Sequence, residues 1–387
     1  MSKLLIAHGG APTAVINASL YGAVQEARRS GRIDGILGAD HGSGGILAER
    51  FHDLNALTDA ELEAIRVSPA SAIGTSRTPL EEADYEQMTR ILQKHDIGYV
   101  LFTGGNGSMD TCARLGHACE GKGIVVGGIP KTIDNDIDLT DHAPGYGSAA
   151  RFAAQSMAEI ASDVAALPIH VCIMEYMGRN AGWITAASVL AREEAEDAPH
   201  MILLPEVPFE EEAFLKRVQE LWQRGHGVVV AVSEGICRAD GTPVAPPIFT
   251  AGRATYYGAV SQYLCGLVIQ KLGIKSRYEV PGILGRCCDE MVSSLDRAEA
   301  EAMGALAART VLSGKGGYMA GLKRISDDPY QCEEILVPVE QLALHERMFP
   351  RDWITDDGFD VTEAFARWCR PLLGGPLKKP FVWKEHI

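Results

Sequence analysis

The sequence has no C-x-x-C pair and no cysteine–histidine cluster with the spacing of a zinc site. Its nine cysteines are scattered singly, apart from the adjacent Cys287 and Cys288, so we expect reduced thiols. No apolar run approaches the ~18 residues of a membrane span, and the first apolar run is too short for a signal peptide. These absences argue against a disulfide-stapled or membrane-spanning protein and favour a cytoplasmic location.

The chain also lacks a cluster of basic residues. It has 36 Lys and Arg but 51 Asp and Glu, which gives a formal net charge of −15. A nucleic-acid binder needs clustered cations, so no nucleic-acid partner is expected. Neither G-x-x-x-x-G-K-[ST] nor G-x-G-x-x-G occurs, which excludes the commonest nucleotide-binding motifs. Any anion site must therefore be built locally, from a few basic side chains and backbone N–H groups.

With 387 residues, of which 46% are hydrophobic, the chain is long enough for two domains. Short apolar runs without polar alternation are typical of strands buried on both faces of a parallel sheet. Such runs occur at 4–8, 35–40, 99–103, 124–129, 171–175, 201–205 and 228–232. Stretches with helical spacing lie between them, at 17–29, 84–95, 148–166 and 211–224. This alternation predicts a doubly wound α/β fold, whereas the tail beyond about residue 320 is predicted to form peripheral helices and loops.

Ligands of such folds bind beyond the carboxyl ends of the strands, and two glycine-rich loops lie there. Gly9-Gly10 follows the first strand, and Gly104-Gly105-Asn106-Gly107-Ser108 follows the third. Glycine allows the backbone to approach an anion, and the next helix offers free N–H groups. The two loops together could cradle a phosphate, although a tight turn without a ligand explains each one equally well.

The fourth strand runs into Pro130-Lys131-Thr132-Ile133-Asp134-Asn135-Asp136. This segment places a lysine, a hydroxyl and two carboxylates within seven residues. Phosphoryl transfer needs a base for the acceptor hydroxyl, a cation for the transferred group and carboxylates that hold Mg²⁺. Composition alone leaves a solvated acidic turn as the alternative.

These motifs resemble those of the phosphofructokinase superfamily, and most of all its pyrophosphate-dependent members. The matching segments follow the family order over roughly residues 3 to 300; they are 9–10 with Asn17, 74–77, 104–108, 130–136, 177–182, 233–235, and Arg277 with Arg286. The resemblance implies two doubly wound α/β domains with mostly parallel sheets and the active site in the cleft between them. It implies a phosphoryl-donor domain at 1–145 plus about 285–345, and a sugar-phosphate domain at 146–284 plus C-terminal helices at about 346–387.

The resemblance also implies a role for each matched residue. Asp134 would be the general base for the sugar 1-hydroxyl, with Lys131, Thr132 and Arg179 as further catalytic groups. The donor would be bound by Gly10, Arg77, Gly104, Gly105, Asn106, Gly107, Ser108 and Lys131. Mg²⁺ would be held by Asn106, Asp134 and Asp136. The sugar phosphate would be bound by Thr132, Asp134, Asp136, His170, Met177, Gly178, Arg179, Glu234, Arg277 and Arg286. Some of these basic residues act across a subunit boundary in the family, which implies a homodimer or homotetramer.

Two positions give opposite indications of the phosphoryl donor. Pyrophosphate users of the family carry a lysine before the threonine, as Lys131 does here, and this lysine would crowd the α-phosphate of ATP. Gly107 is the residue that ATP users carry, whereas pyrophosphate users carry an aspartate, which would repel the α-phosphate of ATP. We favour pyrophosphate, since Lys131 occupies space and adds charge whereas Gly107 merely fails to exclude ATP.

The expected reaction is reversible, Mg²⁺-dependent transfer to fructose 6-phosphate, in glycolysis and gluconeogenesis. Ile283 stands where relatives place a His or Tyr, and isoleucine cannot hydrogen-bond a phosphate. Another ketose phosphate therefore stays open as the acceptor, and ATP stays open as the donor. Asn106 and Ile283 also leave open a non-catalytic sugar-phosphate-binding subunit.

Overall fold

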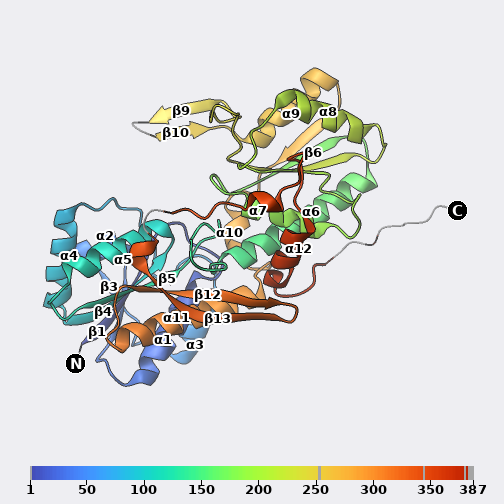
Figure 1. Cartoon of the computed structure of the whole chain (residues 1–387). Helices are drawn as coiled ribbons and strands as arrows, with labels where there is room; N and C mark the ends of the chain where they lie inside the picture. Colours follow the sequence, from blue (N-terminus) through green and yellow to red (C-terminus); the bar gives the residue numbers. More distant parts are fainter. Residues whose placement is uncertain (1, 252–253, 343–344, 379–380, 382–387) are drawn as a thin grey trace. The chain divides into compact units, whose positions relative to one another are not determined.

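The computed structural model describes residues 2–251, 254–342, 345–378 and 381 (Figure 1). The chain divides into two compact units, each built from two stretches of sequence. Unit 1 comprises Met1–Ser148 and Arg286–Arg347, and unit 2 comprises Ala149–Gly285 and Met348–Ile387. No helix among the described residues is long and apolar enough to cross a membrane.

Unit 1 is built on a seven-stranded sheet with the order β13-β12-β5-β4-β1-β2-β3. Its parallel centre consists of β1 (Lys3–His8), β2 (Ile36–Ala39), β4 (Ile97–Gly104) and β5 (Val125–Pro130). The short β3 (Phe51–Asp53) is antiparallel at one edge. The helices are α1 (Ile16–Ser30), α2 (Gly42–Leu47), α3 (Asp59–Val67), α4 (Glu82–Lys94), α5 (Asn106–Ala118) and α11 (Ser294–Leu312). All the predicted strands and helices of this region are therefore confirmed to within a few residues.

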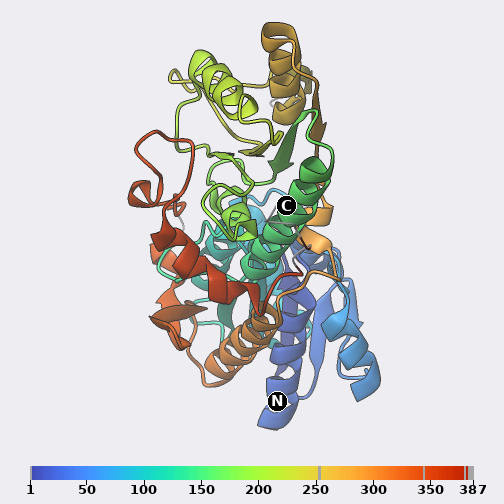
Figure 2. The same ribbon diagram turned by 90° about the vertical axis from the view of Figure 1, so that its right-hand side faces the viewer.

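Successive side chains of β1 enter two different cores, as the period of a strand requires. Leu4 and Ile6 pack with residues of α1 and α11, whereas Leu5 and Ala7 pack with residues of α4 and α5. Helices α1 and α11 lie side by side on one face (Figure 2). Gly304 permits their close approach, because a Cβ at this position would lie only 2.0 Å from the carbonyl oxygen of Ser19.

The prediction of helices and loops beyond residue 320 is wrong for residues 320–338, where the chain forms two strands. Strands β12 (Tyr318–Asp327) and β13 (Tyr330–Pro338) form an antiparallel hairpin (Figure 1), and β12 joins β5 of the central sheet at Met319 and Gly128. Only the first half of β12 is buried, and exposed positions in both strands carry charged residues. A search for continuous apolar runs finds strands buried on both faces, and therefore misses an edge hairpin with one wet face.

Unit 2 contains a four-stranded parallel sheet with the order β11-β6-β8-β7. The strands are β6 (Val171–Tyr176), β7 (Met201–Leu203), β8 (Val228–Ser233) and β11 (Ser276–Glu279). The helices are α6 (Tyr146–Ala166), which starts in unit 1, α7 (Trp183–Ala187), α8 (Glu211–Trp222), α9 (Val260–Leu272), α10 (Leu284–Cys287), which ends in unit 1, and α12 (Glu363–Cys369). A separate hairpin consists of β9 (Pro247–Ala251) and β10 (Ala254–Tyr257).

An aromatic cluster fixes the C-terminal stretch to unit 2. The ring of the fully buried Trp183 lies 5.0 Å from Phe349 and 5.3 Å from Trp368, measured between centroids. Trp353 and Phe365 complete the cluster. Such rings bury a large apolar area in specific geometries, which explains why the segment from Met348 onward belongs to unit 2.

Candidate active site

The loops that follow β1, β4 and β5 in unit 1 surround a cavity of about 370 Å³. These three strands are neighbours and parallel, so their carboxyl ends meet at one edge of the sheet. We call this cavity the donor cavity. The predicted site residues that line it are Gly10, Arg77, Gly105, Gly107, Ser108, Lys131, Thr132, Asp134 and Asp136.

Lys131 is the most buried cation of the donor cavity, with 4% of its surface exposed. Its Nζ donates a hydrogen bond to the carbonyl oxygen of Ala11 at 2.7 Å. Gly10 has a positive φ of 74° and makes room for this ammonium, because a Cβ there would lie 3.4 Å from Nζ. Burial lowers the pKa of Lys131 to about 8, although the carboxylates of Asp136 and Asp134 oppose the shift. Lys131 therefore remains mostly protonated at pH 7.

Two further cations act on the same point. The charges of Arg77 and Arg286 both contribute to the lowered pKa of Lys131, so each acts on this ammonium. Lys131 and Arg77 line the cavity and would attract an anionic ligand, an attraction that the carboxylates of Asp134 and Asp136 partly offset. The donor cavity is therefore suited to a phosphate-bearing molecule.

Thr132, Asp136 and Asn106 form a hydrogen-bonded set beside the cavity. Thr132 Oγ1 donates to Asp136 Oδ1 at 2.8 Å and accepts from the backbone N–H of Asp134 at 3.1 Å. Asn106 Nδ2 donates to the carbonyl oxygen and to Oδ2 of Asp136, at 3.0 and 3.2 Å. Burial raises the pKa of Asp136, and the bond from Thr132 opposes this shift. The set fixes the turn that carries the half-buried Asp134.

The residues at this place fit a magnesium ion. Because Asn106 Nδ2 donates to two acceptors of Asp136, the orientation of its amide is defined. Its Oδ1 is buried and has no hydrogen-bond partner among the described residues. A buried carbonyl oxygen beside carboxylates is the kind of ligand that Mg²⁺ prefers.

Both glycine loops line the cavity, and several of their glycines also have a local structural role. The N–H groups of Gly9 and Gly10 are bonded to the carbonyl oxygens of Thr103 and Ser76, at 2.9 Å each. Gly104 ends β4, and a Cβ there would lie 2.0 Å from Ser108 Oγ, so the glycine permits tight packing of the loop. Gly107 is exposed, and a Cβ there would meet nothing within 4 Å. Space alone therefore does not exclude a larger residue or a larger donor at position 107.

In unit 2, four predicted residues lie at the carboxyl edge of the sheet. Met177, Gly178 and Arg179 follow β6, and Glu234 follows the neighbouring β8. The N–H of Glu234 donates to the carbonyl oxygen of Tyr176 at 3.0 Å, and Gly178 has a φ of 120° that favours glycine. Arg179 is exposed. This edge therefore carries a guanidinium, of Arg179, and a carboxylate, of Glu234, which are groups that can bind a phosphate and sugar hydroxyls.

His170 and Arg277 lie at the opposite end of the same sheet. His170 directly precedes β6, and Arg277 pairs with Cys172 near its start. At about 3.3 Å per residue, His170 is about 20 Å from Met177 along the strand. Unit 2 therefore does not bring His170 and Arg277 together with Met177, Gly178, Arg179 and Glu234. His170 is only 2% exposed, and burial, with the charge of Arg277, lowers its pKa.

Comparison with known proteins identifies the family. Residues 3–311 match the family model described as Phosphofructokinase. The chain belongs to the phosphofructokinase family. It is 38% identical over 389 residues, covering 96% of this chain and 92% of the relative, to a protein of Xanthomonas campestris pv. campestris named pyrophosphate--fructose 6-phosphate 1-phosphotransferase. It is 32% identical over 379 residues to a sulfofructose kinase of Alkalicoccus urumqiensis, covering 97% of this chain and 96% of the relative.

A solved structure agrees with this membership. The pyrophosphate-dependent phosphofructokinase from Nitrosospira multiformis superposes with a TM-score of 0.90 at 34% identity, over 99% of this chain and 94% of the other. The expected phosphofructokinase fold, an α/β architecture with mostly parallel sheets, is therefore confirmed. The chain is an enzyme of this family.

The sequence interpretation missed several cavity residues of this phosphofructokinase-family chain. Ser43, Thr78 and Thr111 add hydroxyl groups to the lining. Thr111 follows Gly107 by one helical turn, so helical spacing from the glycine loop could have indicated it. Ser43 lies in the first turn of α2 and Thr78 in a separate loop, and neither has a comparable signal.

His8, which the sequence favours as a satisfied histidine at a strand end, ends β1 and lines the donor cavity. Its Nδ1 lies 2.8 Å from Ser71 Oγ, whose own proton is donated to the carbonyl oxygen of Gly74. Nδ1 must therefore be the donor, which leaves Nε2 as an acceptor. Burial, together with the charge of Lys131, lowers the pKa of His8 to about 3, so the ring is neutral.

Proposed function

We propose that this chain transfers a phosphoryl group from pyrophosphate to the 1-hydroxyl of fructose 6-phosphate, giving fructose 1,6-bisphosphate and phosphate. The observation that carries this proposal is the buried ammonium of Lys131 in the donor cavity. Lysine has three donors, and the bond to Ala11 uses one, so two remain for phosphate oxygens. The relative named a pyrophosphate-dependent phosphotransferase supports the same donor.

In the proposed reaction Asp134 accepts the proton of the 1-hydroxyl as that oxygen attacks the phosphorus. The new C–O–P linkage forms, the P–O–P linkage of pyrophosphate breaks, and phosphate leaves. Thr132 and Asp136 hold the turn of Asp134 in place, and Lys131 and Arg77 neutralise charge on the donor. One phosphate linkage replaces another, which favours reversibility and a role in both glycolysis and gluconeogenesis.

Asn106, Asp134 and Asp136 are the residues that would hold Mg²⁺, which would supply positive charge to the transferred group. Unit 1 is proposed as the donor domain and unit 2 as the sugar-phosphate domain, in which Met177, Gly178, Arg179 and Glu234 bind the acceptor. Replacing Asp134 by Asn should lower kcat by about 10²–10⁴-fold, as loss of a general base does. An Asp134→Asn variant that retains full kcat would refute this role.

His170 and Arg277 are proposed to bind the phosphate of an acceptor held by a second copy of the chain. Their position at the far end of β6 supports this, since they cannot reach Arg179 of the same sheet. The enzyme would then be a homodimer or homotetramer. Mixing inactive Arg179→Ala and Arg277→Ala variants should restore up to about a quarter of the activity, because half of the dimers are then hybrids with one intact site. No recovery on mixing, in a confirmed oligomer, would contradict the proposal.

The deciding experiment measures turnover of the purified chain with pyrophosphate and with ATP in parallel, each with fructose 6-phosphate and Mg²⁺. We expect turnover with pyrophosphate. Activity with ATP alone would overturn the donor and favour the second candidate, an ATP-dependent enzyme of the same fold. The open space in front of Gly107 is the observation that supports that candidate.

The acceptor is tested in the same assay. Ile283 is 62% exposed and offers no hydrogen bond through its side chain. A relative named sulfofructose kinase shows that another ketose derivative belongs in the panel. We expect the highest kcat/KM with fructose 6-phosphate. A higher value for another ketose phosphate, or for sulfofructose, would replace the acceptor and leave the chemistry of Asp134 unchanged.

A further inference from the structure

A short segment of unit 1 lies directly behind the turn that carries Asp134. We call residues 142–148 the backing segment. The N–H of Thr132 donates to the carbonyl oxygen of Pro144 at 3.1 Å, and Thr132 also pairs with Gly145 in an isolated parallel bridge. The N–H of Ala143 donates to Asn135 Oδ1 at 3.3 Å. The backing segment therefore contacts Thr132 and Asn135, the residues immediately before and after the Ile133–Asp134 pair.

Helix α11 holds the backing segment through two buried carboxylates. Asp296 Oδ1 accepts from the N–H of Gly145 at 2.8 Å, and its Oδ2 accepts from the N–H and the hydroxyl of Ser148, at 2.9 and 2.5 Å. Glu299 Oε2 lies 2.7 Å from His142 Nε2. Residues three apart share one face of a helix, so α11 contacts both ends of the segment.

His142 joins this second contact to the loop before it. Its Nδ1 lies 2.8 Å from Asp141 Oδ2, and its side chain is 1% exposed. Both ring nitrogens lie at hydrogen-bond distance from carboxylate oxygens, which accept, so both nitrogens donate and the ring is a cation. Burial by itself lowers the pKa of His142, but Glu299 and Asp141 outweigh it and raise the pKa to about 9.

Further titratable groups surround His142 and its two carboxylate partners. Arg324 from β12 donates to Asp141 Oδ2 at 2.9 Å, so two cations face the two carboxylates of Asp141 and Glu299. Tyr330 from β13 donates to the other oxygen of Glu299, and Cys332 Sγ lies 3.2 Å from the Tyr330 hydroxyl. Arg347 donates to the carbonyl oxygen of Asp141, and Asp327 accepts from Arg324. Asp296 on α11 interacts with Glu299 through its charge.

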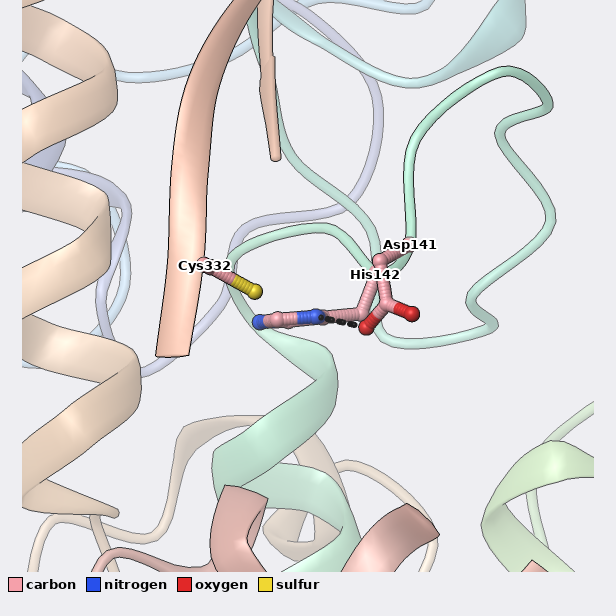
Figure 3. A group of neighbouring side chains, drawn as sticks. All are labelled: Asp141, His142 and Cys332. Carbon is pink, nitrogen blue, oxygen red and sulfur yellow. Dashed lines mark hydrogen bonds and ion pairs between the residues drawn. The ribbon is translucent and has the colours of Figure 1, made fainter. Parts of the chain in front are cut away.

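A metal ion is the alternative occupant, because ligand atoms of Asp141, His142 and Cys332 lie within 4.8 Å of one another. Figure 3 shows the imidazole edge-on, with the sulfur above the ring face and the Asp141 carboxylate close to the ring plane. An imidazole nitrogen binds a metal through its in-plane lone pair, and carboxylates already occupy that direction at both nitrogens. The geometry therefore suits a proton on each nitrogen better than a shared metal.

We propose that His142, held as a cation between Asp141 and Glu299, is a positioning residue that fixes the backing segment and so aligns Thr132 and Asp134 for phosphoryl transfer. This inference rests on the proposed role of Asp134. Small displacements of a reacting group can cost up to about 10²-fold in rate. Loss of the cation should accordingly lower kcat and leave the KM for the donor nearly unchanged, because the donor cavity has its own anchors at Ala11 and Gly10.

The test compares His142→Gln and Glu299→Gln with His117→Gln. His117 and Glu340 form a matched control pair of the same chemistry, 2.9 Å apart, but exposed on the surface of unit 1. We expect His142→Gln to lower kcat by about tenfold or more, with donor KM within about twofold of the wild type. His117→Gln should leave both unchanged. Unchanged kcat in a folded His142→Gln variant, with only a lower unfolding temperature, would reduce the network to a structural role and overturn the proposal.

The pH profile of kcat at saturating donor supplies a readout that a structural role would not move. Wild-type kcat should fall as pH rises through about 9, when the ring loses its cation. In Glu299→Gln this alkaline limb should move to lower pH, because one of the two carboxylates that hold the proton is gone. An unshifted limb would contradict the proposal. Glu299→Gln also carries the test if His142→Gln does not fold.

Two further outcomes separate the alternatives. Stabilisation by Zn²⁺ that is lost in Cys332→Ala would assign the cluster to a metal and overturn the assignment to a proton. A wild-type chain that turns over with neither pyrophosphate nor ATP would refute the proposed function itself. That result differs from failure of the positioning role, which requires an active wild type and an equally active His142→Gln.

Discussion

Replacing Lys131 by Met removes one cation from the donor cavity and leaves a side chain of similar length in place. A hydrogen bond to a charged partner contributes about 1.5–3 kcal/mol, so kcat/KM for pyrophosphate should fall roughly 10- to 150-fold. The matched control is Lys122→Met. Lys122 also donates to a backbone carbonyl, that of Ala118 at 2.6 Å, but it is exposed and lies outside the cavity lining.

The same substitution should stabilise the protein at pH 7. Burial lowers the pKa of Lys131 from 10.5 to about 8, so the folded state holds this proton more weakly than the unfolded chain does. The charged lysine then costs up to about 3 kcal/mol below pH 8, partly offset by its bond to Ala11. Lys131→Met should therefore unfold at an equal or higher temperature while losing activity, a pattern that damage to the fold cannot produce.

The pH dependence gives an independent check. In the wild type, kcat/KM for pyrophosphate reports the free enzyme and should fall about tenfold per pH unit above pH 8, as Lys131 loses its proton. In Lys131→Met this limb should be absent. Steady-state rates with pyrophosphate from pH 6.5 to 9.5 test both statements. A variant with wild-type kcat/KM, or one that keeps the limb at pH 8, would refute our account of this lysine.

Three further substitutions test other parts of the structure. Gly107→Asp should fold normally, because a Cβ there meets nothing within 4 Å, and it should lower any turnover with ATP by more than tenfold through charge repulsion, measured as kcat/KM. Asn106→Asp should lower the Mg²⁺ concentration that gives half-maximal rate by severalfold, and it should lower the unfolding temperature without Mg²⁺, because two carboxylates then face each other at Asp136. Trp183→Ala should cost about 3–5 kcal/mol of unfolding free energy in a denaturant titration, since it empties the centre of the aromatic cluster; a cost below 1 kcal/mol would contradict the view that this cluster fixes the C-terminal stretch.

The fold was predictable where burial is continuous along the chain. The runs that became β1, β4, β5, β6 and β8 are apolar on both sides because helices cover both faces of these sheets, and their ends were predicted to within about two residues. The hairpin β12–β13 was not predictable in this way, because its pairing partner β5 is almost 200 residues earlier and its exposed side chains are charged.

In the candidate site too, features that are local in the sequence were predictable, and contacts between distant segments were not. Lys131, Thr132, Asp134 and Asp136 are close in sequence, so the order of residues along the chain is enough to indicate their shared chemistry. Contacts across distant segments carry no such signal, as the N–H groups of Gly9 and Gly10 illustrate. The sequence predicts only that these glycines let the backbone approach an anion, whereas the structure bonds their N–H groups to the carbonyl oxygens of Thr103 and Ser76. Likewise, only the pairing of β6 and β11 placed His170 and Arg277 at the far end of the sheet.

The sequence by itself indicated the kind of chemistry, because one strand and its following turn carry a lysine, a threonine and two aspartates in fixed order. The tertiary structure decided the electrostatic state of those groups. The lowered pKa of Lys131 and the cationic state of His142 both arise from burial and from partners up to 157 residues away, such as Glu299. A sequence lists ionisable groups, but only the fold sets the distance between charges and their separation from water, and these two quantities govern protonation.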